Sequence, residues 1–224
     1  MLNRYDILES ISQGKDGTMP EENADMVHVA NIIAGATRDI REDEKESRPC
    51  PYDVAEQNER EQRIAEQWAK QSDRWIPMEE IFKLGVPGPS GSESDTYIAR
   101  DVYVYKTNNL MHCGASILIA LERFIDYNTL FPDSAYTLVG FAGFDGRGVY
   151  PVVRQRYIKD GVPATQNEID CYMAALGFTK EDAGKYHNDH FHVSDVLPKN
   201  VLKDPTGDLF VIDVEMQRIS KSEI

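Results

Sequence analysis

The apolar residues near the start of the chain recur at helical spacing among charged residues. Two stretches, 21–44 and 54–71, show this pattern, with apolar positions at Met26, Val29, Ile32 and Ile33 in the first and at Val54, Ile64 and Trp68 in the second. Apolar side chains three or four positions apart lie on one face of an α-helix. The pattern therefore predicts two amphipathic helices, separated by the helix-breaking segment "SRPCPYD".

Beyond Ile76 the apolar residues form short runs of strand type, separated by turn-forming residues. The run "IFKLG" opens this part and leads into the turn-rich segment 87–95. Four further runs predict two strand pairs: "TYIA" and "VYVYK" around a turn at Arg100 and Asp101, and "YTLVGFAGF" and "VYPVVRQRYI" around "DGRG".

Two helices and a hairpin complete the predicted elements. One helix is expected at about 112–127. The segment 164–178 predicts another, because Thr165 followed by Glu168 three positions later is typical of a capping box. Near the end, "NVLKD" and "DLFVID" predict a hairpin turned by "PTG". This order of strands and helices indicates an α+β fold.

The distribution of charge predicts two parts. Residues 1–75 carry 17 acidic and 10 basic side chains, against 21 and 14 in the remaining 149. We therefore expect a helical N-terminal arm at 1–75 and the main domain at 76–224. The arm is expected to pack on that domain or to mediate association with a partner or a second copy. The alternative hypothesis is that it is a regulatory or docking segment.

Composition excludes several classes of function. The net charge of −14, with no basic patch, argues against binding of nucleic acid. The longest strongly apolar stretch, "ASILIAL", is far shorter than the roughly 20 residues that span a bilayer, and the N-terminus lacks the apolar core of a signal peptide. We expect a cytoplasmic chain without a membrane partner. Cys50, Cys113 and Cys171 have no CxxC spacing, so they are interpreted as buried or idle thiols.

The segment 192–213 carries the first candidate chemistry. Asp195 and Asn200 lie five positions apart, and Asp213 lies eighteen beyond Asp195. Asn200 and Asp213 are at the outer ends of the predicted hairpin, which antiparallel pairing brings side by side. One amide and one carboxylate suit Mg²⁺, which completes its coordination with water and phosphate oxygens. Asp195 would then position or deprotonate an attacking hydroxyl in phosphoryl transfer.

A cation for the phosphates is found on a predicted strand. Lys106 ends the apolar run "VYVYK", and Glu122 lies on an otherwise apolar helix face, so we expect Glu122 to point inward and pair with Lys106. The turn-rich segment 87–95, with Gly91 and Ser92, is expected to cover phosphates with its backbone amides and hydroxyls, although it does not match GxGxxG.

These residues resemble motifs of protein kinases. "SDVLPKNVL" resembles the catalytic loop, with Asp195 and Asn200 in the Asp and Asn places of HRDxxxxN, and "VID" resembles the strand that ends at the DFG aspartate, here Asp213. In this resemblance Lys106 matches the lysine of the third strand, and Glu122 matches the glutamate of the helix that follows.

The resemblance extends to the adenine-binding hinge and to one group of kinases. "RQRYI", with Gln155 and Tyr157, matches the hinge. Through "YPVVRQRYI", "ALGF" and "DVLPKNVL", residues 80–215 resemble the small kinase-like domains of polyvalent proteins from phages and conjugative elements, which are mobile elements. This implies a protein-kinase-like bilobal fold with a five-stranded antiparallel N-lobe sheet and a reduced C-lobe. It also implies the use of ATP and magnesium.

The sequence departs from protein kinases at three places. Val193 and Ser194 replace the His and Arg of HRD, so we expect no regulation through a phosphorylated activation loop. "DVE" replaces DFG and resembles the DxE of small-molecule kinases. Because eleven residues follow Asp213, we expect no activation segment, no APE motif and no large helical lobe.

Two functional interpretations follow. The first is an ATP- and Mg-dependent phosphotransferase that acts on an unidentified protein or small-molecule hydroxyl acceptor. The alternative is a catalytically inactive, pseudokinase-like module that binds nucleotide or a protein. A separate site is also conceivable at "YHNDHFH", where His187, His190 and His192 with Asp189 offer ligands for a transition metal, although histidines in such a polar segment are usually solvated.

Overall fold

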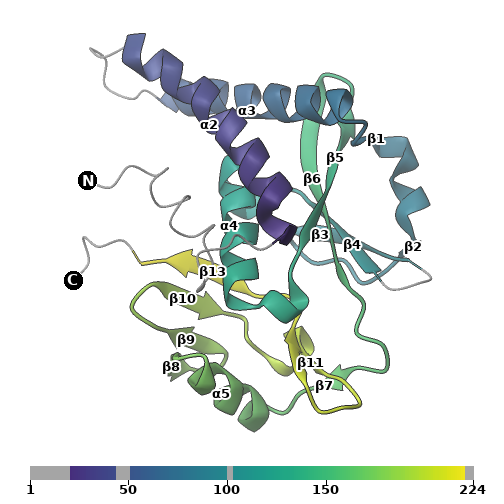
Figure 1. The fold of residues 1–224 in the computed structure, drawn as a ribbon, viewed down its shortest axis with the longest axis vertical. Helices are drawn as coiled ribbons and strands as arrows, with labels where there is room; N and C mark the ends of the chain where they lie inside the picture. The colour runs from purple at the N-terminus through teal and green to yellow at the C-terminus, as the bar shows by residue number, and fades with distance from the viewer. Residues whose placement is uncertain (1–20, 44–50, 100–102, 220–224) are drawn as a thin grey trace. The chain divides into compact units, whose positions relative to one another are not determined.

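The computed structural model describes residues 21–43, 51–99 and 103–219, with side chains from 21 to 36 and from 54 onward within these ranges (Figure 1). The predicted turn at Arg100 and Asp101 lies outside the described residues. The chain divides into two compact units, one within 1–130 and 135–156 and the other within 131–134 and 157–224. Both units contain helices and strands, which confirms the α+β prediction.

The first unit is built on a curled sheet of six strands, in the order β1-β5-β6-β4-β3-β2. Their bounds are β1 (Trp75–Pro77), β2 (Val86–Pro87), β3 (Ser94–Ile98), β4 (Tyr103–Asn108), β5 (Thr137–Phe144) and β6 (Arg147–Arg156). All neighbours are antiparallel except β1, which pairs with β5 in parallel. The predicted five-stranded, wholly antiparallel sheet is therefore not confirmed, because a short parallel strand is added at its edge.

Gly140 allows β1 to lie this close to β5. The N–H of Phe141 donates to the carbonyl oxygen of Arg74 at 3.1 Å. A Cβ at position 140 would lie 2.0 Å from the same oxygen, well inside contact distance. Only glycine fits there, so the parallel edge strand depends on this residue.

The run "IFKLG" was predicted as strand-like, and this prediction is wrong. These residues lie mainly in the 3₁₀ helix η2 (Met78–Leu84), directly after Pro77. Ile81 is buried and packs with Tyr97 and Val152, whereas Phe82 is 64% exposed. Only one side chain of this run, Ile81, is needed to fill the core, and a helical turn buries it without the alternating pattern of a strand.

In the described part of the first unit, three α-helices pack with the sheet. They are α2 (Ala24–Asp43), preceded by the 3₁₀ helix η1 (Glu21–Asn23), α3 (Pro51–Gln71) and α4 (Ile117–Leu130), preceded by the 3₁₀ helix η3 (Met111–Cys113). Figure 1 shows α2 beside α4 and α3 across the end of β5 and β6, in agreement with their contacts. Met26, Val29 and Ile33 are fully buried. The two N-terminal helices therefore pack within the unit that holds the sheet, while a domain boundary at residue 75 stays a prediction.

A buried carboxylate ties α3 to the first turn of α4. Glu61, which is 1% exposed, accepts hydrogen bonds from the Ser116 hydroxyl at 2.7 Å and from the Leu118 N–H at 3.1 Å. Ser116 in turn caps α4, because its hydroxyl oxygen accepts from the Ile119 N–H at 3.2 Å. A carboxylate at a helix N-terminus satisfies free amides and the positive end of the helix dipole. This contact fixes where α4 begins.

The described residues of the second unit form two small sheets and one α-helix. One sheet has the order β13-β10-β9-β8 and the other β12-β11-β7. Their bounds are β7 (Val162–Pro163), β8 (Thr179–Asp182), β9 (Lys185–His187), β10 (Phe191–Ser194), β11 (Val201–Lys203), β12 (Leu209–Val211) and β13 (Glu215–Arg218). The helix is α5 (Gln166–Ala175), and the 3₁₀ helices are η4 (Pro132–Ser134) and η5 (Pro198–Asn200). The predicted capping box at Thr165 and Glu168 is confirmed, because both reciprocal hydrogen bonds are present.

Within the described residues, no helix combines the length and the apolar character that crossing a membrane requires.

The contacts of Glu61 predict a graded loss of stability. Glu61→Ala removes the acceptor of two hydrogen bonds at the start of α4 and should lower the free energy of unfolding by about 2 kcal/mol or more. Glu61→Gln keeps one side-chain oxygen and should cost less. Urea unfolding measures both, with Glu59→Ala at an exposed position of the same helix as the control. Equal stability of Glu61→Ala and Glu59→Ala would contradict the assigned role.

Candidate functional site

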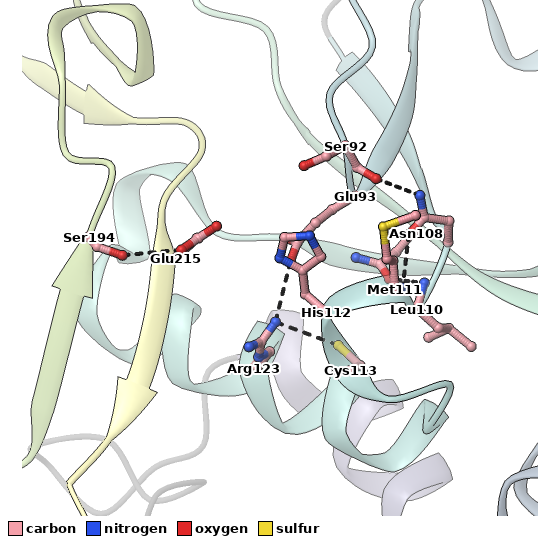
Figure 2. Close-up of polar contacts among 11 residues, drawn as sticks. Ser92, Glu93, Asn108, Leu110, Met111, His112, Cys113, Arg123, Ser194 and Glu215 are labelled. Atoms are coloured by element: carbon pink, nitrogen blue, oxygen red, sulfur yellow. Dashed lines mark hydrogen bonds and ion pairs between the residues drawn. The ribbon is translucent and has the colours of Figure 1, made fainter. Parts of the chain in front are cut away.

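Asp195 lies directly after β10, on the loop that leads to η5. Its φ of 59° is in the left-handed region, which is costly for a residue other than glycine and recurs at functional sites. Val193 is buried in β10, and the Ser194 hydroxyl donates to Oε2 of Glu215 on β13 at 3.2 Å, as Figure 2 shows. The residues that replace the His and Arg of HRD therefore anchor this loop to its sheet.

Gly184 holds the backbone just after Asp195, at Val196. Its carbonyl oxygen accepts from the Val196 N–H at 3.0 Å. A Cβ at position 184 would lie 2.7 Å from a methyl carbon of Leu197, and the φ of 68° also favours glycine. The loop thus follows a path that a larger residue at 184 would displace.

Asn200 holds Asp195 through its side-chain amide. Nδ2 of Asn200 donates both to the Asp195 carbonyl oxygen and to Oδ2 of the Asp195 carboxylate, each at 2.8 Å. The ammonium of Lys199 lies 3.0 Å from the same Oδ2. Asn200 is 8% exposed, whereas the Asp195 side chain is 38% exposed. The Asp195 carboxylate is therefore accessible, and its orientation is held by Lys199 and Asn200, which follow it by four and five positions.

Asp213 follows β12 in the predicted hairpin, which the structure confirms. Val201 pairs with Val211, and the Ile212 N–H donates to the Asn200 carbonyl oxygen at 2.8 Å. Asp213 is the next residue, and its side chain is exposed. Antiparallel pairing therefore brings the two ends of the hairpin together, as the sequence predicted.

The residues at the two ends of this hairpin carry oxygen atoms of the kinds that bind magnesium. Because Nδ2 of Asn200 takes both bonds to Asp195, Oδ1 is the Asn200 atom left for a cation. Asp213, the residue after Ile212, carries a carboxylate and is exposed. One amide and one carboxylate oxygen match the few protein ligands that Mg²⁺ uses when water and phosphate complete its shell.

Lys106 lies in β4, where it is paired with Thr96 of β3 and Val153 of β6. Its ammonium donates to the Tyr136 hydroxyl at 2.9 Å and lies 5.1 Å from the centroid of that ring. The structure thus places the predicted phosphate-binding cation on the sheet and gives it a phenol as a partner. Glu122 lies in the middle of α4 and is half-buried. The Lys106–Glu122 pair stays a prediction.

The predicted hinge residues lie where the chain leaves the first unit. Gln155, in β6, is 3% exposed and donates from Nε2 to the Tyr127 hydroxyl at 3.0 Å. The two units divide between Arg156 and Tyr157. Tyr157 is 43% exposed. The buried Gln155 side chain is thus bonded to α4, and the role of this segment in holding adenine stays a prediction.

The predicted phosphate-covering segment links β2 to β3. The Gly91 N–H donates to the Ser94 carbonyl oxygen at 3.0 Å, and Nδ2 of Asn109 donates to the Ser92 carbonyl oxygen at 2.7 Å. A Cβ at Gly91 would meet no atom within 4 Å. The segment is therefore an ordered turn whose tip is open at Gly91.

Glu93 fastens the end of this segment to the helical side of the unit, as Figure 2 shows. Oε1 of Glu93 lies 2.9 Å from Nδ1 of His112 in η3 and 3.4 Å from Nη1 of Arg123 in α4. Arg123 also contacts the sulfur of Cys113 at 3.7 Å. Burial raises the pKa of the Cys113 thiol, which fits the expectation of an unreactive cysteine.

The hairpin that carries Asn200 is attached to α5 by an ion pair. Nζ of Lys203, on β11, lies 2.6 Å from Oε1 of Glu168, while Oε2 of Glu168 accepts from the N–H and hydroxyl of Thr165. The bond from Lys203, followed by those from Thr165, lowers the pKa of Glu168 to about 2. A single carboxylate therefore caps the helix and holds the strand that follows the site loop.

The histidine segment does not form a metal site. His187 and His192 are neighbours across β9 and β10, with ring centroids 5.8 Å apart. Across residues 21–43, 51–99 and 103–219, no three or more His, Cys, Asp or Glu side chains are arranged to hold a metal ion. The transition-metal alternative therefore has no support.

Two residues near the candidate site were not found from the sequence. Lys199 follows Asp195 by four positions, a spacing that could have indicated an ion pair. Tyr136 is thirty positions from Lys106, and no local pattern connects them. A tyrosine at the start of a strand is more simply read as packing.

Comparison with known protein families gives one result that covers most of the chain. Residues 58–219 match the family described as the serine/threonine/tyrosine kinase found in polyvalent proteins, and the chain belongs to this family. The resemblance seen in the sequence is confirmed, and the match supports a kinase-like phosphotransferase. The comparisons with curated proteins and with solved structures gave no match.

The low pKa of Glu168 predicts a dependence of stability on acid. A folded-state pKa of about 2, below the roughly 4.3 of an unfolded glutamate, means that the unfolded state binds more protons between these values. The stabilisation is complete above about pH 4.5 and is lost as pH falls toward 2. Lys203→Met should raise this pKa, measured by NMR titration of the carboxyl carbon, and should flatten the loss of stability in that window.

Lys185→Met, at an exposed position of β9, is the control for this substitution. An unchanged Glu168 titration in Lys203→Met would show that the ion pair does not set the pKa.

Proposed function

We propose that this member of the kinase family of polyvalent proteins is an ATP- and magnesium-dependent phosphotransferase that acts on a hydroxyl acceptor, either a protein or a small molecule. The observation that carries the proposal is the pair of hydrogen bonds from Nδ2 of Asn200 to Asp195. These bonds couple the amide in a metal-ligand position to the carboxylate that would face the acceptor. Phosphoryl transfer requires both groups, in fixed relation to one another.

Asp195 acts on the acceptor in this proposal. Its accessible carboxylate accepts a hydrogen bond from the acceptor hydroxyl, orients the oxygen toward the phosphorus and takes the proton as the new bond forms. The bond from Asn200 keeps the carboxylate from rotating. The ammonium of Lys199, 3.0 Å from Oδ2, adds a positive charge that would attract the transferred phosphoryl oxygens.

The other predicted residues bind the nucleotide. Asn200 and Asp213 would hold the magnesium ion, which supplies positive charge to the phosphate oxygens when bound. Lys106 would contact the phosphates and Glu122 would hold Lys106. The backbone near Gly91 and Ser92 would cover the phosphates, and the segment with Gln155 and Tyr157 would hold adenine. The direct bond between Lys106 and Tyr136 supports the assignment of Lys106, because it gives the ammonium a fixed reference point.

The first expected outcome concerns binding. MgATP should raise the midpoint of thermal unfolding, because a ligand that binds only the folded state stabilises it, by about 2.7 kcal/mol at 100 times Kd. Asp213→Asn removes a metal ligand and should largely abolish this rise, whereas Asp189→Asn, in an exposed loop of the same unit, should keep it. If millimolar MgATP left the unfolding midpoint of the wild type unchanged, the proposed binding of ATP would be contradicted.

The second expected outcome separates binding from turnover. Asp195→Asn keeps the shape of the side chain but cannot take the proton, so turnover should fall by about 100-fold or more while MgATP affinity stays near that of the wild type. Consumption of ATP is measured with water and with a panel of protein and small-molecule hydroxyl acceptors. Intact binding with no turnover of the wild type on any acceptor would favour the inactive, pseudokinase-like module.

A further inference from the structure

We infer that Tyr136 is a positioning residue for Lys106, and that Asn23 of the N-terminal arm sets the place of Tyr136 through Asn128. The inference rests on the proposed function, because it assigns regulation of the phosphate-binding lysine to contacts with the arm. All four residues belong to the first unit. The chain of hydrogen bonds runs from Asn23 to Asn128, from Asn128 to Tyr136, and from Tyr136 to Lys106.

The backbone of Tyr136 is held from both sides by one amide. Its N–H donates to Oδ1 of Asn128 at 2.7 Å, and its carbonyl oxygen accepts from Nδ2 of Asn128 at 2.8 Å. Asn128 lies in α4 and is 1% exposed. Buried hydrogen bonds are costly to break without replacement. Asn128 therefore fixes the position of the start of β5 relative to α4.

The ring of Tyr136 is fixed by two aromatic side chains of the same helix. Its centroid lies 5.2 Å from that of Phe124 in an edge contact and 4.6 Å from that of Tyr127. Tyr136 itself is 5% exposed. With backbone and ring both constrained, the hydroxyl has a defined position.

The Tyr136 hydroxyl helps to hold the ammonium of Lys106 in position. A lysine side chain has four flexible bonds and loses much entropy when its ammonium is localised. One of its three N–H groups donates to Tyr136 at 2.9 Å, and the ammonium also lies near the ring, so Tyr136 offsets part of this cost before a ligand arrives. Preorganisation of this kind strengthens phosphate binding without a direct contact to phosphate.

Asn23 brings the N-terminal arm into this network. It lies in η1, is fully buried, and accepts through Oδ1 from Nδ2 of Asn128 at 2.8 Å. Figure 1 shows α2, which follows η1, running beside α4. Any displacement of this end of the arm withdraws a partner from Asn128, which then holds Tyr136 less firmly. The arm can thereby influence Lys106, which lies 83 positions further along the chain (106 − 23).

The first test is a double-mutant cycle on MgATP binding. Tyr136→Phe keeps the ring and removes the hydroxyl, and it should weaken MgATP binding by about three- to tenfold, the range that the net contribution of one ordinary hydrogen bond supports. In a Lys106→Met background the same change should have no effect, because the partner is already absent. Tyr103→Phe, on the same strand as Lys106, is the control. Equal effects of Tyr136→Phe in both backgrounds would overturn the inference.

The second test needs no nucleotide. The rate at which a water-soluble acetylating ester modifies the Lys106 amine is followed by mass spectrometry, with exposed Lys159 as the reference within each sample. Tyr136→Phe should raise the Lys106 rate at least threefold relative to Lys159. An unchanged ratio would show that the hydroxyl does not hold Lys106, whatever the outcome of the nucleotide experiments.

Asn23→Ala tests the link to the arm. It should change the Lys106 modification rate in the same direction as Tyr136→Phe, though by less, and Asn31→Ala at an exposed position of α2 should not. A change in Tyr136→Phe without one in Asn23→Ala would remove the arm from the network and leave Tyr136 as the positioning residue. Failure of MgATP to bind the wild type with the modification result intact would overturn the proposed function alone.

Discussion

The arrangement of the first unit depends on the hydrogen bonds that the buried carboxylate of Glu61 accepts. It satisfies the Ser116 hydroxyl and the Leu118 amide where α4 begins, so the axial position of α4 is set by α3. Near its other end, α4 carries Asn128, which fixes the backbone of Tyr136 before β5. A helix held at both ends by buried polar bonds can define the position of a side chain on the sheet far better than apolar packing alone, because such bonds have direction.

The second unit uses the same principle over a much shorter stretch of chain. Asp195 has a left-handed backbone conformation, and its carboxylate is held by Asn200 only five positions later. The conformational cost at Asp195 is offset locally, by the bond from Val196 to Gly184 and by the hairpin that begins after Asn200. The Lys203–Glu168 pair then secures this hairpin to the capping box of α5. Local closure of this kind allows a small unit to present a defined carboxylate.

The elements that the sequence predicted correctly are those whose signals lie within one element or one turn. The capping box at Thr165 and the hairpin after Asn200 are examples, since each depends on residues a few positions apart. The strands β8 to β10 and β13 were not predicted, because they are short and largely polar, and only Tyr186, Val193 and Met216 are buried in them. Parallel β1 was missed because three residues carry no period, and the Lys106–Tyr136 bond because nothing local connects the two residues.

This difference between local and distant signals has a functional consequence. The candidate site residues were proposed from their spacing and from the family resemblance, whereas Tyr136 and Glu61 are ordinary in sequence and were identified only by their contacts. Orientation is supplied by buried hydrogen bonds, and a bond of this kind constrains two residues at once. Asn23 and Glu61 both bind α4, and α4 in turn holds Tyr136. In the inferred network the N-terminal helices therefore help to position Lys106.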